Sequence, residues 1–273
     1  MVVRGSRALI PSTLAATFEA PSTKDFVYGC WGGGVKVFGF ELCLNFVTFL
    51  VILTFALMFV LFYLAFRSPT VVPSKLQTAM ELGVAFVREQ IAIPVLGQDG
   101  DRFLPLLASL FFFILIGNLF EVIPGFNFSA NSRVAFPLTL AIIAWFTYNI
   151  VGIRKHGFFG YLKHTCIIDE APWWLRYTIL MVIEFVSNII IRPITLTVRL
   201  TANFLAGHFL LAIFFLGTVF FLENGPKTWL LAPVSFVFSV GLVGFEIFVA
   251  VLQAFIFAIL TGSYIAGALA EDH

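Results

Sequence analysis

The chain has 273 residues, of which 60% are hydrophobic and 11% charged, and its net charge is +1. Soluble domains carry about 25% charged residues, so the composition excludes an ordinary soluble protein and indicates an integral membrane protein. The near-neutral charge gives no basis for nucleic-acid binding, and three scattered cysteines predict neither a disulfide framework nor a metal site. We expect no cofactor.

The first part of the chain predicts an arm, one crossing and a surface helix. Residues 1–39 are expected to form an extramembrane arm, and residues 40–273 a single membrane domain. The apolar segment 42–66 is long enough for one crossing, which takes about 20 residues. Ser74 and Gln77 have the spacing of a capping box that opens the next helix. Mixed charges in that helix favour a position at the membrane surface, and they are Glu81, Arg88 and Glu89.

Two further crossings follow. One runs from about Phe103 to Ile123 and ends at the helix-breaking pair Pro124-Gly125. The next runs from about Val134 to Ile153 and ends at a basic cluster. Because the connection between them is short, we expect the two crossings to form an antiparallel hairpin.

The C-terminal part predicts two helices that are too long to stand upright in a bilayer. The first covers residues 172–222, roughly 75 Å at 1.5 Å per residue, whereas the hydrocarbon core is about 30 Å thick. We expect a kink at Pro193. A turn after Glu223 leads to the second helix, over residues 227–270. The sequence therefore predicts a long, strongly tilted two-helix hairpin over residues 172–270, and an all-α fold overall.

Small residues recur at every fourth position of the second long helix. This spacing keeps them near one face, where another backbone can approach closely. We expect plain helix–helix packing there, and the residues are Ala250, Ala254, Ala258, Gly262, Ala266 and Ala270.

Lysine and arginine counts predict the orientation. The segments after the first and third crossings each carry four basic residues: Arg67, Lys75, Arg88, Arg102 and Arg154, Lys155, Lys163, Arg176. The opposite loops carry only Arg133 and Lys227, apart from the N-terminal arm. The positive-inside rule then places the surface helix and the C-terminus inside, and the arm outside.

Arg199 is the residue that composition does not explain. It has apolar sequence on both sides, and a central arginine costs roughly 2.5–3.5 kcal/mol on insertion scales, so it predicts a function and a partner. Pairing with Glu184 or Glu246 of the same chain is the ordinary expectation. The alternative is a barrier on a proton path that also engages a carboxylate.

Polar residues form a stripe on each long helix. At 100° per residue, Asn203 lies about 40° from Arg199. Glu184 lies about 60° from it and His208 about 180°. The second helix carries its own line within about 20°, formed by Glu246, Gln253 and Tyr264. Carboxylate, imidazole, amide and hydroxyl groups suit a proton path, whereas arginine keeps its charge.

Two of the polar residues also have simpler explanations. His208 taken alone is more often a hydrogen-bonded packing residue than a proton relay. Arg192 stands just before Pro193, and we favour a role in satisfying the carbonyl groups that a kink frees.

The segment RLTANFLAGH, residues 199–208, closely resembles subunit a of the F-type ATP synthases, in the form found in mitochondria. Three further segments resemble the same family: FFFILIGNLFEVIPG, RKHGFFGYLKH and GFEIFVAVLQAFIFAILTGSYIAGAL. The match covers roughly residues 100–270, and the four segments are highly specific as a set.

The resemblance implies a stator subunit, without a catalytic site of its own, that holds two proton half-channels against a rotating ring of small subunits. Arg199 would face the carboxylate of the ring and separate the half-channels. His208, Glu246, Asn203 and Gln253 would belong to the intermembrane-space side, and Glu184 to the matrix side. The implied location is the mitochondrial inner membrane, with the C-terminus in the matrix, and the implied partners are the subunit c ring, the peripheral stalk, other membrane subunits, lipid and protons.

Two positions depart from the family pattern. Glu184 lies fifteen residues before Arg199, about one more than the family spacing, so either a bulge near Pro193 absorbs the extra residue or Glu184 is not the counterpart. Glu121 stands where small residues are usual.

Two other functions compete with this interpretation. A self-contained proton-coupled transporter would show an internal repeat, and the sequence has none that we detect. A purely structural assembly subunit would tolerate neutral replacement of Arg199 and Glu246.

Overall fold

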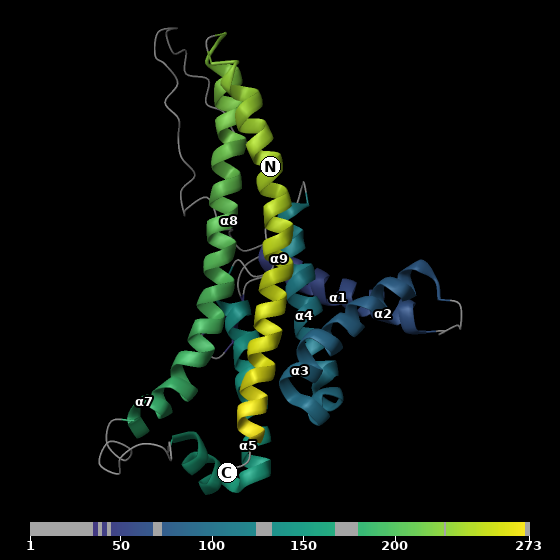
Figure 1. Cartoon of the computed structure of the whole chain (residues 1–273). Coiled ribbons are helices and arrows are strands. Elements are labelled where there is room, and N and C mark those ends of the chain that lie inside the picture. The colour runs from purple at the N-terminus through teal and green to yellow at the C-terminus, as the bar shows by residue number, and fades with distance from the viewer. Residues whose placement is uncertain are drawn as a thin grey trace. The chain divides into compact units, whose positions relative to one another are not determined.

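The computed structural model describes residues 35–37, 40–42, 45–67, 73–123, 133–166, 180–226 and 228–270. Within this part of the chain, five helical stretches are long and apolar enough to cross a membrane. Figure 1 shows them in chain order, and they are Phe46–Phe66, Lys75–Val122, Ala135–Leu162, Met181–Glu223 and Leu231–Leu269. An all-α membrane protein with five apolar helices is confirmed.

Two three-residue strands precede the first helix. Strand β1 (Val35–Val37) pairs antiparallel with β2 (Phe40–Leu42), with Lys36 opposite Glu41. The sequence analysis missed this pair, although apolar and charged residues alternate with the period of a strand in both segments. The rest of the predicted arm, and the outcome of that prediction, lie outside the described residues.

Helix α1 (Phe46–Phe66) begins four residues later than the predicted crossing. The side chain of Asn45 accepts a hydrogen bond from the backbone N–H of Thr48 at 3.0 Å, which satisfies one of the free N–H groups of the first turn. The helix ends where predicted, at the residue before Arg67.

The predicted surface segment is helix α2 (Lys75–Val87), followed by the π-helical η2 (Arg88–Ala92), α3 (Ile93–Leu96) and the 3₁₀ turn η3 (Gly97–Asp99). Only half of the capping box forms. The Ser74 hydroxyl accepts from the N–H of Gln77 at 3.3 Å, but the Gln77 side chain donates to Glu81 instead of returning to Ser74.

Helix α4 (Gly100–Val122) is the second predicted crossing, and α5 (Ala135–Cys166) contains the third. Gly157 has φ 72°, which breaks α5 into two pieces just after the basic cluster. The second piece folds back onto the first, and the Tyr161 ring therefore lies where a side chain on Gly152 would stand. The turn predicted between α4 and α5 lies outside the described residues.

The first long helix is built from α7 (Met181–Val186), the π-helical segment η6 (Ser187–Ile191) and α8 (Arg192–Glu223). The irregularity predicted at Pro193 is therefore present, but it takes the form of a π turn just before the proline. The start of this helix, predicted at residue 172, lies outside the described residues.

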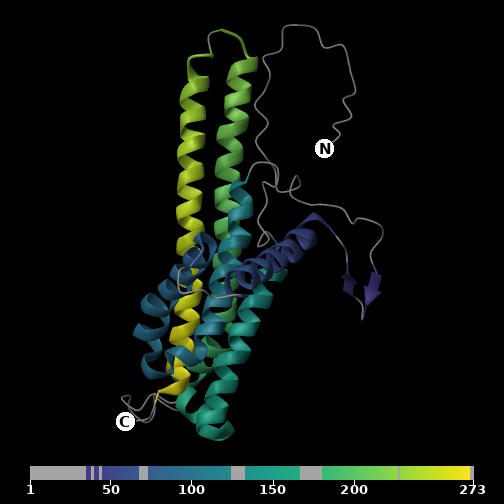
Figure 2. The ribbon, with the colours of Figure 1, turned by 90° about the vertical axis from the view of Figure 1, so that its right-hand side faces the viewer.

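The second long helix is α9 (Leu231–Leu269). By internal contacts the chain divides into two compact units, and the described part of the first is Phe209–Val243. In this unit Gly225 turns the chain with φ 95°, and the Ser235 hydroxyl of α9 donates to the carbonyl of Phe214 on α8 at 2.9 Å. Figure 2 shows the two helices side by side along this unit.

The second unit, Tyr28–His208 with Gly244–His273, holds the main hydrophobic core. Its centre joins α4 to the C-terminal half of α9 through fully buried residues such as Leu107, Ile114 and Phe257. The predicted stripe of small residues lies here: Ala254 and Ala258 are fully buried, and a Cβ atom on Gly262 would stand 3.5–3.9 Å from side chains of η2, α3 and α4. The stripe thus serves helix packing, as expected.

Candidate functional site

Arg199 lies on α8 with its side chain exposed. Within the described part of the chain it forms no ion pair. Thr195, Ala202 and Ala206, which lie within about 60° of it around α8, are also exposed. The expectation that Arg199 pairs with Glu184 or Glu246 is therefore wrong. A permanent cation stands on an apolar, uncovered helix face, which is the situation that calls for a partner outside the chain.

A cluster of acids lies on the opposite side of α8. Glu121 comes from the end of α4, His208 from α8 and Glu246 from α9. The Nδ1 atom of His208 lies 3.9 Å from Oε1 of Glu121, and the side chains are only 16% and 5% exposed. Glu246 is 6% exposed, and its carboxyl group lies against Gly207, the residue before His208. We call these three residues the acid cluster.

Gly207 makes room for the acid cluster. A Cβ atom at this position would stand 2.2 Å from Oε1 and 2.6 Å from Oε2 of Glu246. The carboxyl group of Glu246 therefore lies directly against the backbone of α8, one residue before His208. The helices are packed too closely here for a side chain on residue 207.

Other predicted residues occupy separate positions. Gln253 is buried on α9, about two turns after Glu246, and its Nε2 atom has no hydrogen-bond partner among the described residues. Asn203 is half-buried on α8, one turn after Arg199. The His208 ring stacks on Phe204 at 5.5 Å between centroids. Gln253 thus lies on α9, whereas Asn203 and His208 lie on α8.

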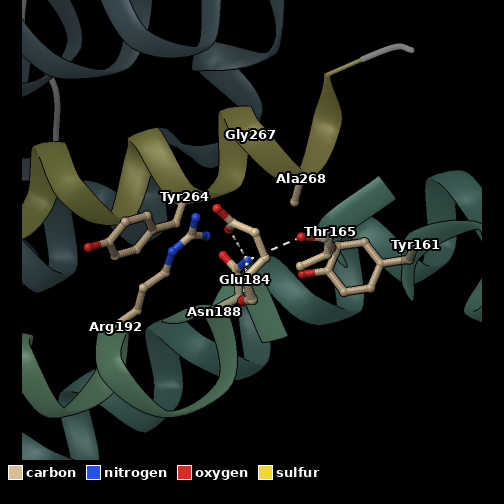
Figure 3. Close-up of a pocket in the computed structure, with 8 residues that line it drawn as sticks. All are labelled: Tyr161, Thr165, Glu184, Asn188, Arg192, Tyr264, Gly267 and Ala268. Carbon is tan, nitrogen blue, oxygen red and sulfur yellow. Dashed lines mark hydrogen bonds between the residues drawn. The ribbon is translucent and has the colours of Figure 1, made fainter. Parts of the chain in front are cut away.

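Glu184 and Tyr264 lie apart from the acid cluster and line a cavity of about 230 Å³. Figure 3 shows the residues that line it, and they are Tyr161, Thr165, Glu184, Asn188, Arg192, Tyr264, Gly267 and Ala268. The Nδ2 atom of Asn188 donates to the Glu184 carboxylate at 3.3 Å and to its backbone carbonyl at 2.9 Å. We call this region the Glu184 cavity.

The π turn shapes the wall of the Glu184 cavity. The N–H of Arg192 bonds to the carbonyl of Ser187, five residues back, and Pro193 has no N–H to offer to Asn188 in the same way. The freed carbonyl of Asn188 accepts instead from the hydroxyl of Tyr148 on α5, at 2.7 Å. Tyr148 is 1% exposed, so this bond is made away from solvent.

Arg192 does not have the role that we favoured from the sequence. Tyr148 supplies the donor for the freed carbonyl, and the Arg192 guanidinium lies 4.6 Å from the centroid of the Tyr264 ring and 6.0 Å from that of Tyr148. The bulge that we expected as one explanation of the long Glu184 to Arg199 spacing is present, as η6.

Three residues of these sites were missed or left unexplained by the sequence analysis. Glu121 was noticed as an acid in an apolar segment, and that anomaly was the available signal. Tyr148 and Asn188 gave no signal, because a tyrosine and an asparagine in long helices are common and their contact joins positions 40 residues apart. Among the described residues, no group of three His, Cys, Asp or Glu side chains could hold a metal ion.

Comparison with known proteins agrees with the geometry. The family model described as ATP synthase A chain matches residues 47–266. The ATP synthase subunit a of Rhodococcus erythropolis is 40% identical over 271 residues, which are 98% of this chain and 97% of that protein. The subunit a of a Nocardioides species is 38% identical over 94% of this chain and 95% of its own length, and that of Frankia alni is 37% identical over 96% and 90%. The chain belongs to the ATP synthase A chain family.

Proposed function

We propose that this chain is the proton-translocating stator subunit of a rotary ATP synthase. It would form two half-channels against a ring of small subunits, each with a membrane-buried carboxylate, and Arg199 would separate them. The observation that carries the proposal is that Arg199 is exposed on α8 and forms no ion pair with any other residue that the structure describes. A partner for this cation has to come from outside the described chain, and an acid on a neighbouring helix fits its charge.

The proposed mechanism follows from the charge of arginine. A ring carboxylate that faces Arg199 stays ionised, because a fixed cation stabilises the charged form. On one side of Arg199 the carboxylate takes a proton from one half-channel and becomes neutral. On the other side it releases a proton to the second half-channel. Arg199 itself cannot carry the proton, so the two half-channels exchange protons only through movement of the ring.

The acid cluster is the proposed end of one half-channel. Glu246 and His208 were assigned there by resemblance, with Asn203 and Gln253, and Glu121 is added because its Oε1 atom lies 3.9 Å from His208. A carboxylate and an imidazole 3.9 Å apart can share a proton after a small movement of either side chain.

The Glu184 cavity is the proposed end of the other half-channel. Its volume of about 230 Å³ is sufficient for several water molecules, each of which takes about 30 Å³. Glu184 is its acid, and Asn188 orients one of the carboxylate oxygens. The π turn supports this assignment, because it accounts for the extra residue between Glu184 and Arg199.

The proposal extends to partners and location. The subunit c ring, the peripheral stalk and the other membrane subunits would surround the chain, together with lipid. The mitochondrial inner membrane has no support among the relatives named above, which are bacterial, and we propose a bacterial plasma membrane instead. The distribution of basic residues favours a C-terminus inside and an extramembrane arm over residues 1–39 outside. The lengths of α8 and α9, 32 and 39 residues, favour strongly tilted C-terminal helices.

Replacement of Arg199 tests the proposal. In inverted membrane vesicles, Arg199→Ala is expected to reduce proton-driven ATP synthesis to background, because nothing then separates the half-channels. Arg67→Ala, an exposed arginine at the end of α1, serves as the control and is expected to leave synthesis within about twofold. Retained synthesis in the Arg199→Ala complex would refute the role.

Purification separates the proposal from a self-contained transporter. The chain is expected to co-purify with a ring of small proteins that carry a membrane-buried carboxylate. A transporter would be isolated alone and would still move protons when reconstituted.

A further inference from the structure

Arg192 is a cation inside the Glu184 cavity whose place the proposed mechanism does not explain. Its guanidinium lies 4.6 Å from the centroid of the Tyr264 ring, well within the distance of about 6 Å at which a cation is attracted to a ring face. The Tyr148 ring lies 6.0 Å away on the same guanidinium. Two rings therefore hold one cation.

The two rings also hold each other. Their centroids are 5.7 Å apart and their planes meet at 62°, which is the edge-to-face arrangement that aromatic pairs prefer. Tyr148 is fixed by its buried hydrogen bond to the carbonyl of Asn188. Tyr148 is thus the rigid support, and the face of Tyr264 is positioned against it.

Arg192 has an alternative partner with which it forms no ion pair among the described residues. Glu184 lines the same cavity, and Figure 3 shows both side chains pointing into it. In the described part of the chain no ion pair joins them, and the Glu184 carboxylate accepts from Asn188 instead. Opposite charges in a partly buried cavity attract each other strongly, so something must keep the guanidinium away from the acid.

Tyr264 acts through its ring and not through its hydroxyl. Among the described residues its hydroxyl makes no hydrogen bond, whereas those of Tyr148 and Tyr161 both do. The sequence analysis placed Tyr264 on the proton path as a hydroxyl group. In the structure it is the ring of Tyr264 that contacts the Arg192 guanidinium.

We propose that Tyr264 is a positioning residue that holds Arg192 off Glu184 and so keeps the Glu184 carboxylate free to exchange a proton. This inference rests on the proposed function of the Glu184 cavity as a half-channel. If the ring is lost, Arg192 is free to swing onto Glu184 and pair with it. The pair would hold the carboxylate ionised and occupy its oxygens, and proton exchange in this cavity would slow.

Four variants in the intact complex test the inference, with proton-driven ATP synthesis in inverted vesicles as the measurement. Tyr264→Leu removes the ring and is expected to lower the rate roughly threefold or more, the size of a partly buried cation–π contact. Tyr264→Phe keeps the ring and removes the hydroxyl, and it is expected to match the unchanged protein. Arg192→Gln removes the cation, and its rate is the reference for the double variant described next.

The decisive variant is the double substitution Tyr264→Leu with Arg192→Gln. It is expected to recover the rate of Arg192→Gln alone, because without the cation nothing can pair with Glu184. A residue that only fills space would not be rescued by removing its neighbour's charge. Failure of this recovery, or a Tyr264→Phe complex as slow as Tyr264→Leu, overturns the inference.

Arg199→Ala is measured in the same experiment. If that complex still makes ATP, the proposed function fails. If it makes none and the double variant stays slow, the proposed function stands and only the role of Tyr264 is wrong.

Discussion

The acid cluster and the Glu184 cavity both contain carboxyl groups, but those of the acid cluster are closely packed and that of the Glu184 cavity lines an open space. In the acid cluster, Glu121 and Glu246 are almost fully buried, and Gly207 lies in contact with a carboxyl group. In the Glu184 cavity the acid lines about 230 Å³ of open space and accepts a hydrogen bond from Asn188. Under the proposed function, packing would control proton access at the acid cluster, and water would reach the acid in the Glu184 cavity.

The two regions also differ in the basic residue that accompanies their acids. The acid cluster has only His208, whose charge depends on protonation. The Glu184 cavity contains Arg192, which is always charged and is held by aromatic rings. Two acids with one histidine can share protons among themselves, whereas an acid beside a permanent cation needs that cation kept at a distance.

A pair of glycine substitutions gives the largest expected contrast. Gly207→Ala adds a methyl group where the Glu246 carboxyl group stands, and displacement of a reacting group by about 1 Å can cost about a hundredfold in rate. We expect at least a tenfold loss of proton-driven ATP synthesis. Gly267→Ala, in the wall of the Glu184 cavity, meets nothing within 4 Å and is expected to stay within about twofold. Equal losses in both variants would remove the distinction between a packed and an open site.

Chemical labelling gives the next contrast. In a chain whose cysteines at positions 30, 43 and 166 are replaced by serine, Glu184→Cys and Glu121→Cys each introduce one thiol. A water-soluble thiol reagent reacts with exposed thiolates and spares buried thiols. We expect the thiol at 184 to react about tenfold faster than the thiol at 121. Faster labelling at 121 would show that the acid cluster is the wetter region.

The smallest expected effect concerns stability. Tyr148→Phe leaves the carbonyl of Asn188 buried without a donor, which costs about 1–3 kcal/mol. At about 2–4 °C per kcal/mol, the thermal unfolding midpoint of the purified complex should fall by several degrees. Tyr63→Phe is the matched control, since Tyr63 is 51% exposed and its hydroxyl makes no hydrogen bond within the described residues. An unchanged midpoint for Tyr148→Phe would show that another donor reaches the carbonyl.

The crossings could be predicted from the sequence because apolar length alone defines them. The bounds of α1 and α4 differ from the predicted ones by four residues or fewer, and the stripe of small residues packs as expected. Pro193 marked an irregularity in the first long helix, but its form as a turn with one extra residue could be inferred only through the family spacing. The strands β1 and β2 were missed because three residues are too few for a period to stand out.

The candidate sites were harder to predict, because helical angles give the face of a residue but not what packs against that face. The angle of about 180° between His208 and Arg199 correctly separated the acid cluster from the exposed cation. It could not bring Glu121 to His208, since that contact depends on how α4 meets α8. It also could not distinguish a tyrosine ring from a tyrosine hydroxyl as the working group of Tyr264.

The π turn over Ser187–Ile191 allows the sequence of this helix to be one residue longer without a change in the faces that its two ends present. A turn closed by five residues holds one residue more than an ordinary turn, so the segments before and after it keep their faces while the sequence grows by one. Glu184 can therefore point into its cavity and Arg199 away from the chain, although their numbering is out of step with the common pattern. Insertion and deletion at this turn should be the least costly change of length in the whole helix, and two orthologues that differ by one residue here can still superpose on both sides of it.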